Sequence, residues 1–501
     1  MRKSSLSVLV VLFLVFCLAA PSMAWQGRMA GAGDAAGLIE DASDFLIHPA
    51  LIASGKGFNA YGHYGLTYEK TTKWNYKSTV PTYGWYYPYE TSGDAWKNQL
   101  QLGTAFTLGA GRMGVFFEYE GSKGKYDGQE NYSGFGSGLY NIEMDDRFNN
   151  LKLRLLYGLP IGAVNLGGEL QIAYINEAKE TLMFEAGGDS WRNWPWAAED
   201  GPAVSLFPFM IPYDSKYWEA QGKVSVDGNA GNIRYAATFK AAIPFASDNQ
   251  YIIGEDYIDE SELVGKVKGY SVGGDFWLRV PVSSTVVLPF VVSAAYKSIE
   301  RDGTGFSFWN SFYRSTINYN HTETNLNVKI GGGADITPSK GTKIAAGLYY
   351  DYISAKQDAN FDDTFLSGVF FVDTYADMPK YSEHRLTIKA LAEKDLTETL
   401  ALRCGIGAFY GKVKSDYAYS AYDSGGVPYD ALDLSANGSS MGVNASIGAS
   451  VKLARVSLEP FLNAGYASVS TSGDGVYGPL PVSAELDKTN WQVGGGLSVK
   501  F

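Results

Sequence analysis

The segment Trp491-Gln-Val-Gly-Gly-Gly-Leu-Ser-Val-Lys-Phe501 decides the fold, because its residues alternate strictly between two faces. Every second residue, counted back from the end, is apolar or glycine: Phe501, Val499, Leu497, Gly495, Val493 and Trp491. The residues between them are polar or glycine: Lys500, Ser498, Gly496, Gly494 and Gln492. A period of two residues is typical of a β-strand. We therefore expect a strand that lies between an apolar and a polar environment.

This terminal segment resembles the closing strand of bacterial outer-membrane β-barrels, in which a terminal aromatic residue is read by the barrel-assembly machinery. The resemblance implies that Phe501 is an assembly signal and that this machinery is a partner of the chain. A closing strand also removes the free edge of a sheet, which matters because lipid offers no partner to unpaired backbone groups. The rest of the chain is then expected to supply the other strands.

Residues 1–24 have the pattern of a secretory signal peptide: a basic start, an apolar run and the small-residue cleavage site Ser22-Met23-Ala24. The mature chain is expected to begin at Trp25. No later stretch of about 18 residues is apolar throughout, so we expect no transmembrane helix after the signal. The mature chain has Cys404 as its single cysteine, which excludes a disulfide scaffold.

The composition favours a membrane barrel over a soluble enzyme. Glycine accounts for 58 of 501 residues and aromatic residues for 14%, as expected for strands with interfacial aromatics and small lumen residues. The mean hydropathy of -0.12 fits a barrel, in which only alternate residues face lipid. A net charge of -12, with no basic patch or tail, excludes a nucleic-acid-binding protein.

Alternating segments continue through residues 57–501 and predict an all-β, transmembrane, antiparallel up-and-down barrel of about 16 strands, with 14 as the other count left open. The expected strands are residues 57–70, 97–109, 112–121, 147–158, 163–176, 216–227, 231–243, 264–280, 284–298, 321–336, 341–354, 381–394, 398–412, 440–453, 456–469 and 487–501.

Short and long connections alternate between these segments without exception. Seven tight turns are expected at residues 110–111, 159–162, 227–230, 281–283, 337–340, 395–397 and 454–455. Eight long polar connections separate them, near residues 71–96, 122–146, 177–215, 244–263, 299–320, 355–380, 413–439 and 470–486. This pattern is typical of short periplasmic turns and long extracellular loops, so both termini are expected on the periplasmic side.

Residues 25–56 form a separate N-terminal segment, which glycines break into short pieces. Gly27-Arg28, a stretch of small residues, Asp41-Ala42 and Pro49-Ala-Leu-Ile52 resemble the mature N-terminus of the long-chain fatty-acid outer-membrane transporter family. His48 stands where that family usually has Asn. The resemblance implies a plug inside the barrel that includes Asp41, His48 and Pro49. The alternative is a leader that packs against the lower rim of the barrel.

The face opposite the apolar residues is expected to line a polar lumen. Its charged residues are nearly balanced in sign, and those chosen as pore-lining are Lys152, Arg154, Arg234, Arg279, Lys329, Arg385, Lys389, Arg403, Glu118, Glu120 and Glu169. Lys152 and Arg154 form the sharpest cluster, because two cations on one face require compensation. Either lumen carboxylates such as Glu118 or Glu169 pair with them, or they give the pore a slight anion preference.

The longest connection, residues 177–215, has three open interpretations. It contains Trp191, Trp194 and Trp196, followed by Glu199 and Asp200 and then an apolar stretch. The strand plan resembles that of general porins, in which the third external loop folds inward and constricts the pore opposite a basic wall. An apolar external groove would instead suit a fatty-acid transporter. The third interpretation is an ordered external cap.

The sequence favours a porin-like outer-membrane channel for passive diffusion of small solutes. The alternative is a plugged barrel that transports hydrophobic ligands such as fatty acids or aromatic hydrocarbons. An outer-membrane enzyme is a minor alternative, because the four histidines show no spacing that indicates a catalytic site. We expect no cofactor and no metal site. Expected partners are outer-membrane lipid and lipopolysaccharide, and a homotrimer is left open.

Overall fold

The computed structural model describes 14 stretches of the chain. No helix within them is long and apolar enough to cross a membrane. The described residues are 38–39, 42–80, 85–132, 138–185, 190–192, 213–253, 258–259, 261–309, 313–365, 372–377, 380–422, 428–454, 456–477 and 480–500.

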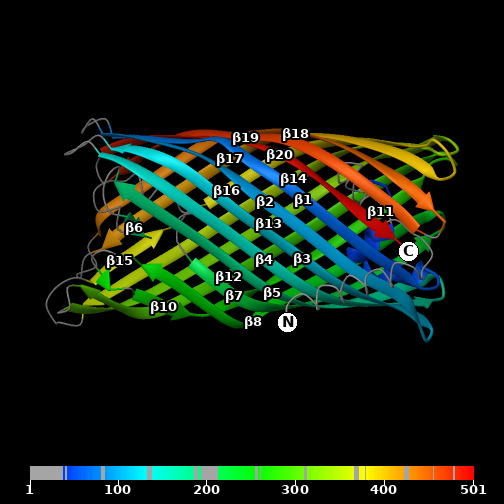
Figure 1. The fold of residues 1–501 in the computed structure, drawn as a ribbon, viewed down its shortest axis with the longest axis horizontal. Coiled ribbons are helices and arrows are strands. Elements are labelled where there is room, and N and C mark those ends of the chain that lie inside the picture. The colour runs from blue at the N-terminus through cyan, green and yellow to red at the C-terminus, as the bar shows by residue number, and fades with distance from the viewer. Residues whose placement is uncertain are drawn as a thin grey trace, which may run out of the picture.

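Sixteen long antiparallel strands form a closed barrel (Figure 1). Each strand pairs with the next along the chain, and β1 pairs with β20 to close the sheet. The predicted fold class and the count of 16 are confirmed. The strands are β1 (Asn59–Val80), β2 (Trp85–Leu108), β3 (Gly111–Tyr132), β4 (Gly138–Ile161), β5 (Val164–Glu185), β7 (Tyr213–Ala230), β8 (Ile233–Ile253), β11 (Val267–Pro281), β12 (Val286–Trp309), β13 (Tyr313–Ser339), β14 (Thr342–Phe365), β16 (Lys380–Asp395), β17 (Leu400–Tyr422), β18 (Pro428–Leu453), β19 (Val456–Tyr477) and β20 (Leu480–Lys500).

Short turns join the strands at one end of the barrel, here named the turn end; the opposite end is the loop end (Figure 1). Gly109, Gly162 and Gly231 adopt positive φ angles of 60°, 61° and 64° in these turns, a conformation that glycine reaches without steric cost. The turn expected at residues 227–230 was placed wrongly. β7 runs on to Ala230, because Gly231 is the residue that can make the reversal.

The strands continue much further toward the loop end than predicted. Residues 71–80 and 85–96, expected as a long connection, belong to β1 and β2 and pair with each other. Beyond the lipid both faces of a strand meet water, so backbone pairing can continue without apolar alternation. The short strands β6 (Ser190–Arg192), β9 (Ile258–Asp259), β10 (Ser261–Gly265) and β15 (Val372–Asp377) also pair within these loop-end extensions.

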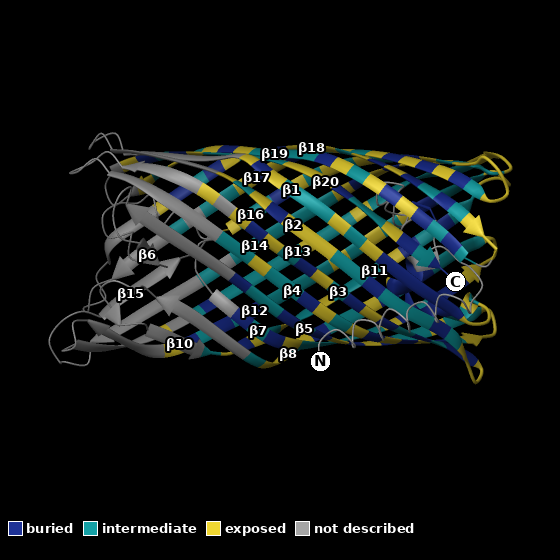
Figure 2. Ribbon diagram, in the orientation of Figure 1, coloured by how far each residue is buried: buried dark blue, intermediate teal, exposed yellow. Residues whose placement is uncertain are grey.

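An apolar belt covers the outside of the barrel. Large side chains on the outer face are widely exposed, as in Leu170 at 68%, Ile406 at 64% and Leu462 at 63%. Figure 2 shows exposed and buried residues alternating along the strands. A soluble protein would bury such residues, whereas in a closed barrel this belt faces lipid. The chain is therefore a transmembrane β-barrel of the bacterial outer membrane, as predicted.

Two short 3-10 helices, η1 (Ala42–Leu46) and η2 (Pro49–Ser54), lie inside the barrel at the turn end. They belong to the part of the N-terminal region that the structure describes, residues 38–39 and 42–56, here named the inner segment. Every described residue from Leu46 to Ile52, apart from Ile47, is buried. The strands of the barrel wall supply the surface that buries them.

Candidate functional site

Apolar side chains of the inner segment pack against the lumen wall. Phe45 lies 5.3 Å from the ring of Phe116 on β3 and 5.9 Å from the ring of Tyr61 on β1, measured between centroids. Leu51 and Ile52 join the same buried cluster. Full burial of one such side chain contributes about 1.5–3 kcal/mol, so Phe45, Leu51 and Ile52 together contribute on the order of 5–9 kcal/mol to retention of the segment.

Glycines in the wall let the backbone of the inner segment approach the strands directly. A Cβ atom at Gly167 on β5 would overlap the backbone of Ala50. A Cβ at Gly158 on β4 would lie 2.7 Å from Cγ2 of Ile52. The backbone nitrogen of Ala50 also donates a hydrogen bond of 2.6 Å to the Ser225 hydroxyl on β7. Gly158 and Gly167 thus form a surface complementary to the inner segment, here named the glycine seat.

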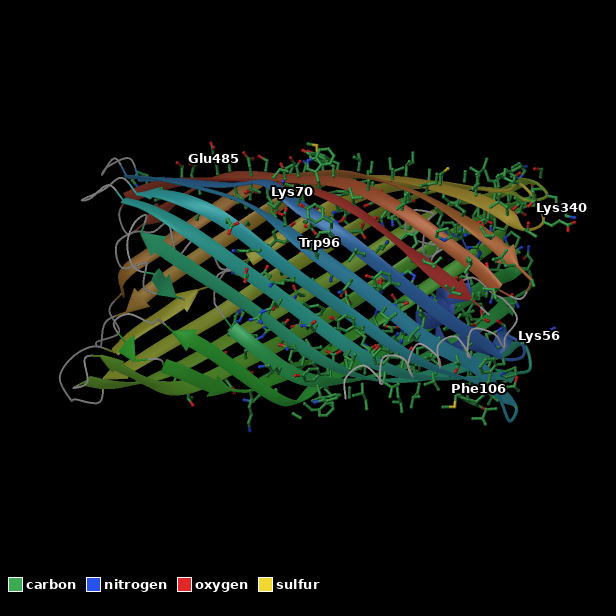
Figure 3. The ribbon with its side chains drawn as sticks, in the orientation of Figure 1. Lys56, Lys70, Trp96, Phe106, Lys340 and Glu485 are labelled. Atoms are coloured by element: carbon green, nitrogen blue, oxygen red, sulfur yellow. The ribbon has the colours of Figure 1, made fainter. Side chains whose placement is uncertain are left out.

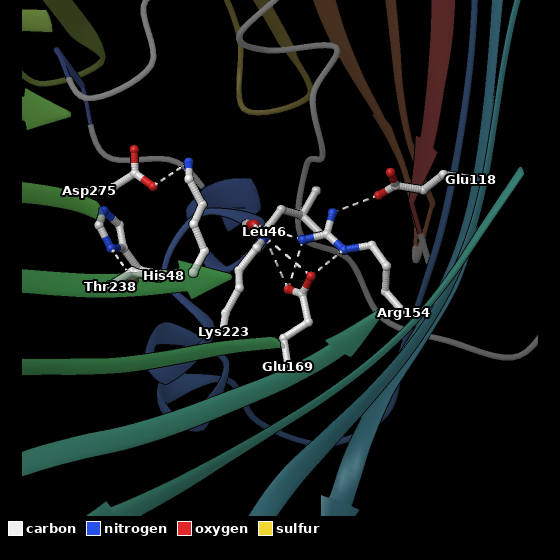
Figure 4. Close-up of polar contacts among 9 residues, drawn as sticks. Leu46, His48, Glu118, Arg154, Glu169, Lys223, Thr238 and Asp275 are labelled. Atoms are coloured by element: carbon white, nitrogen blue, oxygen red, sulfur yellow. Dashed lines mark hydrogen bonds and ion pairs between the residues drawn. The ribbon is translucent and has the colours of Figure 1, made fainter. Parts of the chain in front are cut away.

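Two cations hold one backbone carbonyl of the inner segment, and two carboxylates pair with these cations (Figure 4). Arg154 Nη2 donates to the Leu46 oxygen at 2.7 Å, and Lys223 Nζ donates to the same oxygen at 2.9 Å. Glu169 lies between the two cations, 2.8 Å from Arg154 and 3.2 Å from Lys223. Glu118 accepts from Arg154 at 2.7 Å. We name this group the carbonyl clamp.

In the carbonyl clamp, buried cations and buried carboxylates compensate one another's charge. Glu118, Arg154, Glu169 and Lys223 come from the neighbouring strands β3, β4, β5 and β7, and their side chains are at most 11% exposed. Two cations face two carboxylates, so the Leu46 carbonyl accepts two charge-assisted hydrogen bonds at a site without net charge. Removal of one partner would leave an unpaired buried charge, which is costly.

His48 connects the inner segment to the next strands of the wall, β8 and β11, beside β7. Its Nδ1 atom lies 2.8 Å from the Thr238 hydroxyl on β8, and its ring meets the Trp277 ring edge-on at 6.0 Å. Burial lowers the pKa of His48 to about 4, although Asp275 and Asp227 act in the opposite direction. The ring is therefore neutral at neutral pH, as its buried position requires. Figure 4 shows His48 pointing toward Thr238, away from the clamp.

Most of the remaining predicted lumen cations pair with carboxylates. Lys152 lies 3.9 Å from Glu120. Arg234 binds Asp227 at 3.1 Å, and Arg279 binds Asp335 at 2.6 Å while donating to the Leu38 oxygen of the inner segment at 3.4 Å. Arg403 binds Glu393 at 2.9 Å. Since Lys152 and Arg154 both have carboxylate partners, the pairing interpretation describes this cluster better than a free basic wall.

Three other predicted residues line a cavity of about 370 Å³ that is formed by residues of β1, β13, β14 and β16–β20. Lys329 lies 4.8 Å over the Tyr349 ring, and Arg385 binds Glu383 at 2.7 Å. Lys389 shares the cavity with Asp351 and several amide side chains. The lining combines charged side chains of both signs and amide side chains with apolar ones such as Phe409 and Val443, so water or a polar solute would find hydrogen-bond partners there.

Several predicted residues lie outside the described part of the chain: Asp41 of the plug, Trp194, Trp196, Glu199 and Asp200 of the third connection, and the assembly signal Phe501. Trp191 is within β6, where its backbone pairs with Met183 on β5. Pro49 begins η2 and is buried.

Sequence reasoning missed Lys223, Thr238 and Trp277, which complete the contacts of the inner segment. Lys223 follows the same alternation as Arg154 and precedes the outward-facing Val224, so the strand pattern could have placed it in the lumen. The same alternation could have placed Thr238, which precedes outward-facing Phe239, and Trp277, which follows outward-facing Phe276, in the lumen. Their role depends on the register that places them beside His48, which is 190 residues from Thr238 along the chain.

The fold and this site define a class: a transmembrane β-barrel in which part of the N-terminal region of the chain occupies the turn end of the lumen. No protein-family model matches the chain, and no curated protein matches its sequence.

Solved structures with some similarity include a deletion mutant of the monoaromatic hydrocarbon channel TodX, with 12% identity, a TM-score of 0.41, and coverage of 91% of this chain and 93% of that one. The Pseudomonas putida toluene transporter TodX has 10% identity, a TM-score of 0.39, and coverage of 95% and 98%. A Pseudomonas aeruginosa FadL homologue has 10% identity, a TM-score of 0.41, and coverage of 96% and 99%.

Proposed function

We propose that this protein is a plugged outer-membrane barrel that transports hydrophobic ligands, such as aromatic hydrocarbons or fatty acids. The observation that carries the proposal is the fixed position of the inner segment in the lumen. The carbonyl clamp, Ser225 and Thr238 bind it by hydrogen bonds, and the glycine seat at Gly158 and Gly167 fits its backbone. In a porin with a permanently open lumen, no segment of the chain would need to be held at this position.

The surface beneath the inner segment supports the ligand class. Movement of the segment would uncover Tyr61, Phe116, Leu156 and Trp277, which now pack against it. Apolar side chains at the mouth of a pathway favour apolar ligands. The N-terminal residues, including Pro49-Ala-Leu-Ile52, resemble those of the long-chain fatty-acid transporter family. This resemblance also supports apolar molecules as the ligand class.

Passive diffusion of small hydrophilic solutes is the second candidate. The cavity beside Lys329, Arg385 and Lys389 favours it, because part of its lining carries charges of both signs and amide groups that can bind water or ions. In this case the ligand would pass the inner segment without needing an apolar surface.

Uptake by intact cells separates the two candidates. The full chain is expressed in cells whose outer membrane has no other route for the solutes, and uptake of radiolabelled toluene or oleate is compared with that of a small sugar. We expect the hydrophobic ligands to enter several-fold faster than in cells with an empty vector, with sugar uptake unchanged. Faster sugar entry with no gain for toluene or oleate would reject hydrophobic transport in favour of diffusion.

A further inference from the structure

The outer wall changes from apolar to basic within two residues on β17. Its outward-facing side chains include Leu402, Ile406 and Tyr410, all exposed on the lipid-facing belt. The next outward-facing residues toward the loop end are Lys412 and Lys414, which are also exposed. The lysines therefore begin where the apolar belt ends.

Aromatic residues mark this border on the neighbouring strands. His384 on β16 lies directly opposite Lys412, and its Nδ1 atom lies 2.6 Å from the Tyr350 hydroxyl on β14. The ring of Tyr352 is 5.0 Å from that of His384. Aromatic side chains with a polar group collect at the level of lipid head groups. The lysines just beyond them are thus at head-group height.

Positive charge is in excess at this place. Lys356 on β14 lies directly opposite Lys380 on β16, and together with Lys412 and Lys414 they form what we name the basic patch. Lys356 pairs with Asp358 at 2.5 Å, and Lys414 pairs with Asp416 at 2.7 Å.

Within the described residues, Lys380 and Lys412 have no ion pair; Asp416, directly opposite Lys380 on β17, pairs with Lys414 instead. Four lysines against two carboxylates leave an excess of two positive charges, in a chain whose net charge is -12. Like charges on directly opposite residues are destabilising, so a bound anion would relieve the repulsion between Lys356 and Lys380.

We propose that the basic patch binds the phosphorylated head group of an outer-leaflet glycolipid of the lipid A type. Short turns face the periplasm in such barrels, so the loop end and the patch face outward. The acyl chains would lie along the exposed Leu386, Ile388 and Ile406, and the phosphates would reach Lys380 and Lys412. Ser382, opposite Lys414, and Ser439, opposite Lys412, offer hydroxyl donors to further oxygens.

The double variant Lys380→Gln with Lys412→Gln tests this proposal. Neither lysine has an ion pair among the described residues, so the change leaves no carboxylate without its partner. Binding of lipid A to the full chain in detergent is measured by native mass spectrometry. Since each lysine near an anionic head group contributes about 1 kcal/mol, we expect about 30-fold weaker binding.

The matched control replaces two exposed lysines by Gln at the turn end, opposite to the end that holds the patch: Lys340, labelled in Figure 3, and Lys452 near the end of β18. The control should bind lipid A as the unmodified protein does. Dephosphorylated lipid A should bind weakly and equally to all three proteins. Equal lipid A affinity of the patch variant and the control would overturn the proposal, as would tight binding of the dephosphorylated lipid to the unmodified protein.

Discussion

Replacement of Glu169 by Gln is expected to loosen the inner segment while leaving the barrel closed. The Glu169 carboxylate lies 2.8 Å from Arg154 and 3.2 Å from Lys223, and both cations bind the Leu46 carbonyl. In the variant Arg154 keeps its ion pair with Glu118, whereas Lys223 loses its carboxylate partner. Breaking a buried ion pair costs about 3–5 kcal/mol. The apolar contacts of the segment contribute on the order of 5–9 kcal/mol, so the segment should remain bound most of the time but open far more often.

Hydrogen exchange measures this opening directly. If the segment opens without unfolding of the barrel, a loss of about 3 kcal/mol or more lowers the protection of its backbone amides by about 100-fold or more. The control is Glu383→Gln, which removes a buried carboxylate bound to Arg385 on β16, away from the inner segment. Peptides covering residues 42–56 should exchange faster in the Glu169 variant only. Unchanged exchange in that variant, with the barrel intact, would refute the role of the clamp.

Three further outcomes follow from the same contacts. Gly167→Val should displace the inner segment, because even a Cβ atom would overlap Ala50; gel mobility should show an intact barrel, and residues 42–56 should become accessible to protease. His48 has its pKa lowered to about 4, so its contribution to retention is complete above pH 6.5 and is lost as the pH falls through about 4. Channel openings should therefore become more frequent over this range, and His48→Asn should remove that dependence. Leu462→Arg in the lipid-facing belt should lower the free energy of unfolding by about 2–4 kcal/mol in denaturant titrations, whereas Ser470→Arg beyond the belt on the same strand should change it little.

The alternation of side chains predicted the barrel well because lipid enforces it. Each strand must present apolar residues outward at every second position, so the pattern of Trp491 to Val499 recurs around the wall. Outside the lipid this constraint ends, and the sequence no longer separates strand from loop. That is why residues 71–80 and 85–96 were expected to be a connection although β1 and β2 continue through them.

The site was predictable in its parts and not in its assembly. Alternation placed Glu118, Arg154 and Glu169 on the lumen face, and each lies in the clamp. Their convergence on the carbonyl of Leu46 depends on where the inner segment enters the barrel and on the stagger of four strands. Every residue has a backbone carbonyl, so the sequence does not indicate that the carbonyl of Leu46 is the one that is bound. The same holds for the pairing of His48 with Thr238, which only the closed barrel brings together.

Single-channel conductance in a planar lipid bilayer tests the central claim most directly. The protein comprising residues 25–501 is compared with a variant that lacks residues 25–56. We predict that the longer protein stays silent or opens rarely, and that the variant gives large, stable current steps because its lumen has lost the inner segment. Large, stable steps from the protein with its N-terminal region intact would contradict a plugged barrel and would identify an open pore.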